Sequence, residues 1–281
     1  MRLSLGSAVV LGLSDAAVDV LPTTCYILVG DKCPNNCSFC TQAKDSTADA
    51  DQLSRVTWPE FDDNLVYDKL IDAYTSGRIW RACIQATDNS FDKCLEIVEQ
   101  INIPICISLN ANEEQISQLI EAGAETVTLA LDAATEKVFS RVKTGSFNEI
   151  LTILKNSSKR HPGKIGTHLI VGLGETKEEM IETIRYMYDN GINAGLFAFT
   201  PVKGTKMENM QQPDIKTYRK IQAEHFKIRF KTDKIEPEAF ETTGCPGCNR
   251  PFYNESPGKT LYNYPRKLTD EEFKECLQQL N

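Results

Sequence analysis

The 281-residue sequence predicts an α/β fold: a partial (βα)6 barrel of the TIM type, followed by a cysteine-bearing C-terminal extension. Apolar, β-branched runs alternate along the chain with segments of helical period, which is the pattern of successive βα units around a parallel sheet. Short glycine-bearing turns at 121–125 and 190–193 return the chain from helix to strand, as helix C-caps do. We expect the barrel and an N-terminal lead-in over 1–235, and the extension with its CPGC motif over 236–281.

Six runs rich in β-branched residues are the expected strands of the barrel. They are residues 23–30, 80–87, 103–110, 126–131, 166–173 and 194–200. Segments of helical period fill the intervals between them and follow the last strand. The expected helices are residues 62–75, 91–100, 112–122, 147–159, 177–190 and 213–230.

The first 22 residues contain one apolar patch, around 8–13, which is followed by acidic residues. The patch is too short to span a bilayer. We interpret the segment as an amphipathic helix that leads into the barrel. A signal peptide is the alternative, because Arg2 precedes the apolar run.

Composition narrows the classes of partner. The chain has 39 Asp and Glu against 31 Lys and Arg, a formal net charge of −8, so it lacks the basic footprint of a nucleic-acid-binding protein. No segment predicts a membrane span, and we expect no membrane partner. Ten cysteines in such a chain favour a reducing, cytoplasmic location, where clustered thiols bind metals or do chemistry more often than they form disulfides.

Three of the ten cysteines lie in one loop, directly after the first expected strand. In a TIM-type barrel the loops at the C-terminal strand ends carry the chemistry. Cys33, Cys37 and Cys40 have the spacing C-x3-C-x2-C. A cubane of four irons offers four metal positions and this loop offers three thiolates, so one iron remains for another ligand. The alternative is a zinc site, but a closed zinc site needs a fourth protein ligand, and none lies near the triplet.

This loop, with the aromatic Phe39 before its last cysteine, resembles the cluster loop of the radical S-adenosylmethionine (radical SAM) enzymes. The resemblance implies that Cys33, Cys37 and Cys40 are catalytic and hold a [4Fe-4S] cluster that binds S-adenosylmethionine, with Phe39 beside the cofactor. It implies a 5'-deoxyadenosyl radical that abstracts hydrogen from unactivated C–H bonds.

The segment THLIVGLGET, at 167–176, resembles the fifth-strand motif of the same family. In that motif glycines let the backbone approach the adenine of the cofactor, and an acidic residue caps the turn. Gly172, Gly174 and Glu175 fit these positions. A side chain in place of either glycine would prevent close contact between strand end and ligand.

The segment LALDAATEKVF resembles the fourth strand of the biotin synthase branch, in which an Asp at the position of Asp132 hydrogen-bonds the cofactor ribose. That branch binds the cofactor carboxylate with an Arg, and Gly145 stands at its position here. Arg141 or Lys143 therefore substitutes, or the contact is lost. Asp132 is alternatively an N-cap for a helix from Ala133 onward.

Cys245 and Cys248 form a C-x2-C pair in a Gly/Pro turn, a spacing that lets both thiolates face one metal. Biotin synthase has one ligand of its auxiliary cluster at the position of Cys83 and a second at that of Cys106, but Gly166 stands where it has a third. We expect a second cluster on Cys83, Cys245 and Cys248. Cys25 is the alternative to Cys83 as the third ligand. Ser256 and Thr243 are candidate oxygen ligands for the fourth position. We expect Cys94 and Cys276 to be packing or surface thiols.

The cysteine motifs, the fifth-strand motif and the tail at 244–266 together resemble the radical SAM subunits of the two-component lipoyl synthase of archaea and some bacteria. The resemblance implies a sulfurtransferase of lipoate biosynthesis that inserts sulfur into the octanoyl chain of a lipoyl carrier protein. Its partners would be a second radical SAM subunit and an electron donor such as ferredoxin or flavodoxin. One alternative is a biotin synthase-like enzyme that acts on a small molecule. Another is a non-catalytic zinc or iron-sulfur assembly protein.

Overall fold

A computed structural model describes residues 1–255 and 258–281, and its central element is a seven-stranded sheet. The strand order is β1-β2-β5-β6-β7-β8-β9, and every neighbouring pair from β2 to β9 is parallel. The partial barrel with six parallel strands is therefore confirmed. The strands are β1 (Arg2–Leu3), β2 (Thr24–Val29), β5 (Arg81–Ala86), β6 (Ile105–Ser108), β7 (Thr126–Thr128), β8 (Ile165–Val171) and β9 (Asn193–Ala198), with β3 (Gln52–Leu53) and β4 (Val56–Thr57) in a separate hairpin.

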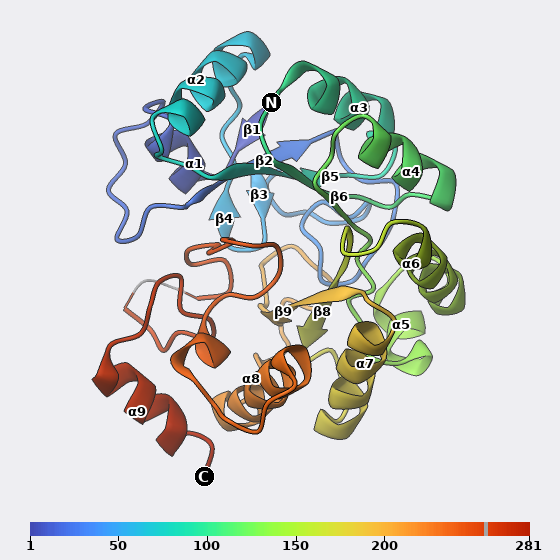
Figure 1. Cartoon of the computed structure of the whole chain (residues 1–281), viewed down its shortest axis with the longest axis vertical. Coiled ribbons are helices and arrows are strands. Elements are labelled where there is room, and N and C mark those ends of the chain that lie inside the picture. Colours follow the sequence, from blue (N-terminus) through green and yellow to red (C-terminus); the bar gives the residue numbers. More distant parts are fainter. Residues whose placement is uncertain (256–257) are drawn as a thin grey trace.

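Helices lie around the outside of the strands, as Figure 1 shows. All six predicted helices are present, and each begins and ends within two residues of its expected bounds. The elements that periodicity did not predict are β1, the hairpin, α5, η1 and α9, of which all but the nine-residue α9 are too short to show a period. The helices are α1 (Leu5–Val10), α2 (Asp63–Thr75), α3 (Phe91–Gln100), α4 (Glu113–Glu121), α5 (Glu136–Val142), α6 (Phe147–Arg160), α7 (Lys177–Asp189), α8 (Ile215–Phe230), η1 (Pro237–Phe240) and α9 (Asp270–Gln278).

The N-terminal segment is part of the barrel core. Helix α1 has six residues and begins after Ser4, whose side chain accepts a hydrogen bond from the backbone N–H of Ser7. Ala8 and Leu11 are almost fully buried in the main core. Over residues 1–255 and 258–281, no helix has the length and apolar character needed to cross a membrane.

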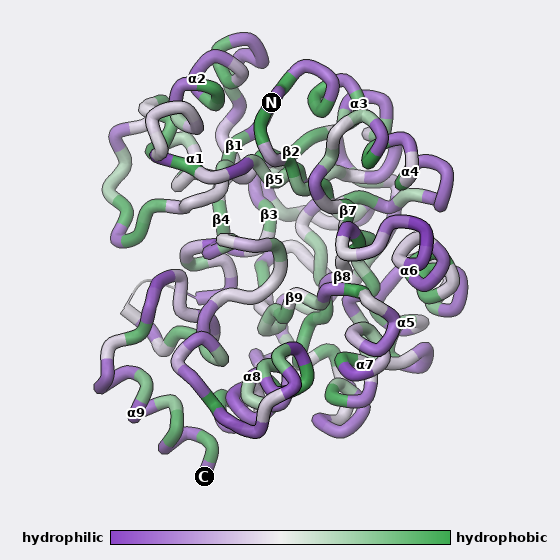
Figure 2. The backbone as a smooth tube through the Cα atoms, viewed as in Figure 1, coloured by the Kyte–Doolittle hydropathy of each residue, from purple (hydrophilic) through white to green (hydrophobic). Residues whose placement is uncertain are grey.

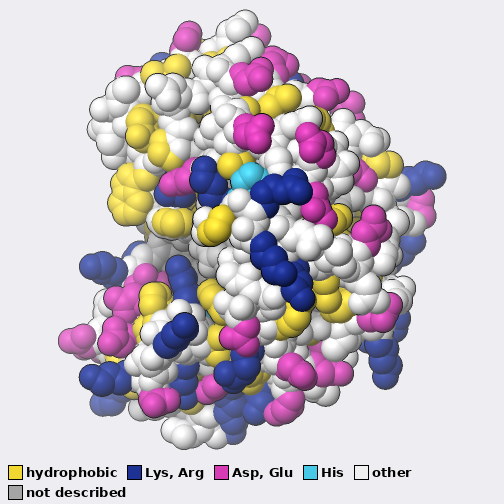
Figure 3. All heavy atoms as spheres, turned by 45° about the vertical axis from the view of Figure 1, so that its right-hand side comes forward, with side chains coloured by type: hydrophobic (Ala, Val, Ile, Leu, Met, Phe, Trp, Pro, Cys, Tyr) yellow, Lys and Arg dark blue, Asp and Glu magenta, His cyan; other side chains and the backbone are white. Residues whose placement is uncertain are grey.

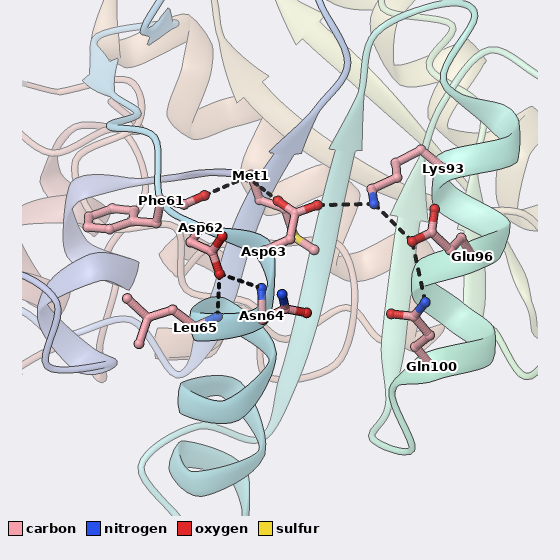
Figure 4. A network of polar contacts seen from close by, with 9 residues as sticks. All are labelled: Met1, Phe61, Asp62, Asp63, Asn64, Leu65, Lys93, Glu96 and Gln100. Atoms are coloured by element: carbon pink, nitrogen blue, oxygen red, sulfur yellow. Dashed lines mark hydrogen bonds and ion pairs between the residues drawn. The ribbon is translucent and has the colours of Figure 1, made fainter.

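A polar network fixes the chain start to two outer helices (Figure 4). The Met1 amino group donates to the Phe61 carbonyl oxygen at 2.8 Å and contacts Asp63, the first residue of α2, at 2.5 Å. Lys93 of α3 lies 3.0 Å from both Asp63 and Glu96. These pairs are partly exposed, so they position β1, α2 and α3 more than they stabilise the fold.

Strand β2 is buried on both faces, as expected for a parallel strand between helices and a filled interior. Alternate residues point to opposite faces of a strand. Ile27 and Val29 therefore pack into the main core beneath the helices, whereas Tyr26 and Leu28 pack with Trp58 in a second cluster inside the barrel. Figure 2 shows the corresponding hydrophobic stretches along the central strands.

The sheet is open between its two edges, and the C-terminal extension bridges this opening. On the β9 side, the Leu196 N–H donates to Thr243 Oγ1 at 2.8 Å. On the β2 side, the Thr23 N–H donates to Asn249 Oδ1 at 3.1 Å. The CPGC turn lies between these two anchors, so the extension holds its cysteines against the barrel interior.

A buried arginine ties the rest of the extension to α8. Arg219 is fully buried, and its guanidinium donates to the carbonyl oxygens of Tyr262, at 2.6 Å, and Leu261. Glu255 is also buried, and one of its carboxylate oxygens accepts the backbone N–H groups of Tyr262 and Asn263, both at 2.9 Å. Charge-assisted bonds of this kind are among the stronger hydrogen bonds in proteins.

Buried His225 makes the stability of the fold depend on pH. Burial lowers its pKa to about 4, whereas the unfolded chain binds this proton at about pH 6.5. The unfolded state therefore binds more protons in this window, and stability should fall as the pH drops, by about 1.4 kcal/mol per pH unit for this residue. Urea unfolding between about pH 7 and 4.5 should give a shallower slope for His225→Gln. Equal slopes for the two proteins would contradict this account.

Candidate functional site

The first cysteine group lies in the loop after β2, at the C-terminal end of the barrel. The loop is closed by backbone hydrogen bonds from the Cys33 N–H to the Gln42 oxygen, at 2.9 Å, and from the Cys40 N–H to the Cys37 oxygen, at 3.2 Å. All three cysteines are free and half-buried. Burial and the neighbouring thiols raise the pKa of Cys40 to about 12, and burial also raises that of Cys37. Three thiolates in this loop therefore need a compensating positive charge.

Of the cavities that border this loop, one reaches Cys33 and another reaches Cys40. The larger, about 400 Å³, opens at the ends of β5, β6 and β7 and is lined by Cys33, Lys143 and polar residues such as Asn110. The smaller, about 130 Å³, is lined by Phe39, Cys40 and other residues that include Asp132. The triplet thus has space on both sides for a ligand.

Asp132 follows β7 in a strained backbone conformation. Its φ is 64°, in the left-handed region, yet it is 7% exposed and its peptide group bridges to β8 through the His168 oxygen and the Ile170 N–H, each at 2.8 Å. Such strain in a residue other than glycine is concentrated at functional sites. The alternative prediction, a helix N-cap at Asp132, is wrong. Helix α5 begins at Glu136, and its N-cap is Thr135.

Of the two cations predicted to substitute for the missing arginine, Lys143 lies at the site. Its Nζ is 2.5 Å from Asp132 Oδ2, both side chains are almost buried, and it also donates to the Ala130 carbonyl oxygen. Arg141 is exposed and lies against Gly174, where an added Cβ would be 2.8 Å from Nη2. Asp132 and Lys143 therefore form a neutral pair beside the cysteine loop.

The turn after β8 has the geometry that its motif predicts. Gly172 and Gly174 have φ values of 104° and 115°, and the Glu175 carboxylate accepts the Gly172 N–H at 2.7 Å. A Cβ at Gly172 would come within 2.9 Å of Pro213 Cδ, so packing within the protein already requires glycine there. Neither glycine lines the two cavities beside the cysteine loop, and contact with an adenine stays a prediction.

A second cysteine group lies in the barrel interior, near the N-terminal ends of the strands. Cys83 of β5 and Cys106 of β6 are register partners, and they pack in one cluster with Cys245 and Cys248 of the extension. Each sulfur has a side-chain hydrogen-bond partner, and the Cys106 sulfur also lies 3.9 Å from Glu125 Oε2. The pairs are Gln85 Nε2 and Cys83 at 3.1 Å, Arg81 Nη1 and Cys106 at 3.3 Å, Thr126 Oγ1 and Cys245 at 3.5 Å, and Tyr26 Oη and Cys248 at 3.4 Å.

The other hydrogen bonds of the Tyr26 hydroxyl show which group donates in its hydrogen bond with Cys248. Its hydroxyl oxygen accepts the backbone N–H groups of Asn249, at 3.2 Å, and Arg250, at 2.8 Å. The remaining hydroxyl proton is therefore directed to the Cys248 sulfur. At Cys106, hydrogen bonds from Cys245, Thr126 and Arg81 lower the pKa to about 7. By contrast, burial raises the pKa of Cys83, and the hydrogen bond with Cys106 together with burial raises the pKa of Cys245, both well above the ordinary value. The group therefore favours a thiolate, the form in which cysteine binds metals, at Cys106, and more than one thiolate needs the positive charge of a metal.

The membership of this group differs from the prediction. Cys106 belongs to it, although the absence of a cysteine at 166 led us to treat that part of the pattern as broken; its position opposite Cys83 in the next strand was the available signal. Cys25 does not belong to it. Cys25 lies on the other face of β2, packs in the main core, and has its pKa raised to about 12 by burial.

The oxygen ligands predicted for this group stay predictions. The Thr243 hydroxyl oxygen is engaged by the Leu196 N–H, and Ser256 lies outside the described residues. Cys94 and Cys276 are both fully buried, in the main core and in a small core under α9, so both are packing thiols.

Throughout residues 1–255 and 258–281, no three His, Cys, Asp or Glu side chains converge on one metal-ion position. A closed zinc site requires such convergence. A cubane binds each thiolate through a different iron, so its ligands stand further apart. The donor set of either cysteine group, soft thiols on separate segments, fits an iron-sulfur cluster better than a single zinc ion.

The two cysteine groups line neighbouring cavities in the barrel interior. A cavity of about 430 Å³ reaches Cys83, Cys245 and Cys248, and it shares part of its lining with the small cavity at Cys40. Figure 3 shows the surface hollowed between the upper and lower halves of the molecule, with hydrophobic side chains along the hollow. The side chains common to both cavities are Gln85, His168, Phe197 and Tyr253.

Comparison with known proteins agrees with this geometry. The profile of the radical SAM superfamily matches residues 27–187, more than half of the chain, including the cysteine loop and the turn after β8. The chain belongs to the radical SAM superfamily. The family implies a [4Fe-4S] cluster and S-adenosylmethionine, and the donor set of the first cysteine group fits them.

Among curated relatives, an uncharacterized protein of Methanocaldococcus jannaschii is 30% identical over 123 residues, which are 42% of this chain and 32% of that protein. The biotin synthase of Persephonella marina is 26% identical over 187 residues, which are 64% of this chain and 55% of that enzyme. The chain thus spans about half, or less, of the length of these relatives.

Solved structures of low identity share the fold. Methylornithine synthase has a TM-score of 0.60 at 17% identity, over 92% of this chain and 80% of that one. The FeFe-hydrogenase maturase from Carboxydothermus hydrogenoformans has a TM-score of 0.55 at 15% identity, over 76% of this chain and 54% of that one.

Replacement of Cys37 by Ala should remove the first cluster and leave the barrel intact, because the loop lies outside the main core. After anaerobic reconstitution the variant should bind about four fewer iron atoms per chain and should not cleave S-adenosylmethionine. Iron analysis and chromatography of 5'-deoxyadenosine test this, with Cys94→Ala as the control for loss of a cysteine. Cofactor cleavage at the wild-type rate by the Cys37 variant would contradict the assignment.

Proposed function

We propose that this chain is a radical SAM sulfurtransferase that inserts sulfur into the octanoyl chain of a lipoyl carrier protein, as a component of a lipoyl synthase. It would act with a second radical SAM subunit and with reduced ferredoxin or flavodoxin. The observation that supports this best is the pair of cysteine groups on neighbouring cavities of the barrel interior. Cys33, Cys37 and Cys40 would hold the cofactor-binding cluster. Cys83, Cys106, Cys245 and Cys248 would hold a second one.

When bound, the first cluster and S-adenosylmethionine supply a 5'-deoxyadenosyl radical that takes a hydrogen atom from an unactivated C–H bond. The second cluster is a co-substrate in this proposal. It gives up sulfide to the substrate carbon, and the electron released as the C–S bond forms reduces its iron. One cofactor molecule and one electron from the donor are consumed for each sulfur inserted.

The residues between the two groups would exclude water and hold the substrate chain. Phe197 and Tyr253 stack edge to face, with centroids 5.6 Å apart, and burial lowers the pKa of His168 to about 3. His168 therefore stays neutral at physiological pH. A dry interior without a titrating acid protects a carbon radical from side reactions.

An apolar cavity that an alkyl chain could occupy adjoins the second cysteine group. This cavity, about 460 Å³, is lined largely by apolar residues of the N-terminal segment and the hairpin. It shares Tyr26, Trp58, Arg250 and Tyr253 with the cavity at the second cysteine group. A linear acyl chain would fit such a series of adjacent cavities.

The second candidate is a biotin synthase-like enzyme that acts on a free small molecule. It is favoured by the match to biotin synthase and by the cysteines on adjacent strands. The tail cysteines, which close the second group from the extension, favour the first proposal. The third possibility, a non-catalytic assembly protein, is less well supported. Such a protein would need neither the strained backbone at Asp132 nor neighbouring cavities at the two cysteine groups.

Replacing Cys245 and Cys248 together by Ala separates these functions. The variant should lose about half of its iron, still form 5'-deoxyadenosine in the presence of octanoylated carrier peptide, and give no thiolated peptide by mass spectrometry. The assay contains the partner subunit, cofactor and reductant, and Cys276→Ala is the control. Normal sulfur insertion by the double variant would refute the proposal. If the wild type thiolated a free acid and not the peptide, the second candidate would replace it.

A further inference from the structure

One of the four sulfurs in the second cysteine group has a different partner from the others. Gln85, Thr126 and Tyr26 are neutral, whereas the Cys106 sulfur lies 3.3 Å from the Arg81 guanidinium and, further away, 3.9 Å from Glu125 Oε2. Arg81 is 8% exposed. A charge-assisted hydrogen bond of this kind is about twice as strong as a neutral one.

The Glu125 carboxylate also holds the Arg81 guanidinium in place. Arg81 Nη1 also lies 2.5 Å from Glu125 Oε2, and the Glu125 side chain is 40% exposed. The Arg81 Nε is buried and makes no hydrogen bond within the described part of the chain. Most of the hydrogen bonding of this buried cation is thus directed at one carboxylate and one cysteine sulfur.

Two effects on metal binding follow from this geometry. The electron pairs that Cys106 shares with a guanidinium proton would be less available to iron, so a cluster held by the four cysteines would be bound more weakly at Cys106 than at the other three. A Cys106 thiolate that has left the iron keeps its negative charge paired with Arg81 in the low-dielectric interior, where an unpaired charge would be costly.

We propose that Arg81 makes Cys106 the releasable ligand of the second cluster, an inference that rests on the proposed function. Release breaks the bond between Cys106 and iron heterolytically, both electrons stay on sulfur, and the guanidinium stabilises the thiolate. No oxidant or reductant is needed. Four thiolates would otherwise close the site, and a cluster that gives up sulfide needs a coordination shell that opens. Arg81 is a positioning residue, and Glu125 moderates its charge.

The test uses the second cluster alone, in a chain with Cys33, Cys37 and Cys40 changed to Ala. After anaerobic reconstitution, loss of iron to a ferrous chelator is followed by absorbance. Arg81→Met should slow the loss by roughly tenfold, because the thiolate loses its cation. Glu125→Gln should accelerate it by roughly threefold, because the guanidinium then acts on Cys106 alone.

These opposite directions distinguish the proposal from a structural role. Both substitutions break the same ion pair, so a merely structural contribution would change both rates in the same direction, and that result would overturn the inference. Tyr26→Phe, which removes a neutral donor from Cys248, is the matched control and should have the smallest effect.

A second measurement needs only the full-length, reconstituted protein. Because Cys106 is 1% exposed and Cys245 and Cys248 are half-buried, alkylation with iodoacetamide is compared between variants at Cys106 and not between the four cysteines. Peptide mass analysis should show faster labelling of Cys106 in Glu125→Gln than in the wild type, and slower labelling in Arg81→Met. Equal rates at Cys106 in the three proteins would overturn the inference. If the triple variant takes up no iron at all, the second cluster itself is refuted, and the proposed function fails together with the inference.

Discussion

The attachment of the C-terminal extension to both edges of the open barrel is the constraint on which the site depends. Thr243 accepts a hydrogen bond from β9, and Asn249 accepts one from the residue before β2. Because Cys245 and Cys248 lie between these anchors, they are held against the two strand cysteines. Without the extension, Cys83 and Cys106 would face an open interior with no partners from outside the sheet.

The same attachment determines the polarity of the interior. The Arg250 guanidinium lies 3.8 Å from the centroid of the Phe197 ring, and it donates to the Thr243 carbonyl oxygen at 2.8 Å. A fixed cation on an aromatic face contributes to binding where water is excluded. It also lowers the pKa of His168, after the larger effect of burial, and so keeps that ring neutral. The extension is thus part of the chemical environment of the barrel as well as its cover.

The arrangement separates two demands that a radical sulfur transfer would make. The first cysteine group lies at the C-terminal end of the barrel, where loops can admit a cofactor and an electron donor. The second lies in the barrel interior near the N-terminal strand ends, where each sulfur meets a defined side-chain partner. The side chains shared by their cavities lie between the two groups. Opposite ends of one barrel therefore hold the two sets of ligands without mutual interference.

The sequence by itself determined the local features: the six βα units, the C-x3-C-x2-C loop after the first strand, and the glutamate that caps the turn after β8. Periodicity and short spacings specify these because the interacting residues are near in the chain. Only the tertiary structure decided that Cys106 joins the second group and Cys25 does not, and that Lys143 pairs with Asp132. The register aligns Tyr26, not Cys25, with Cys83, and neighbouring residues of a strand point to opposite faces. A one-residue difference in register thus determines which cysteines meet, and register is fixed by packing across the whole sheet.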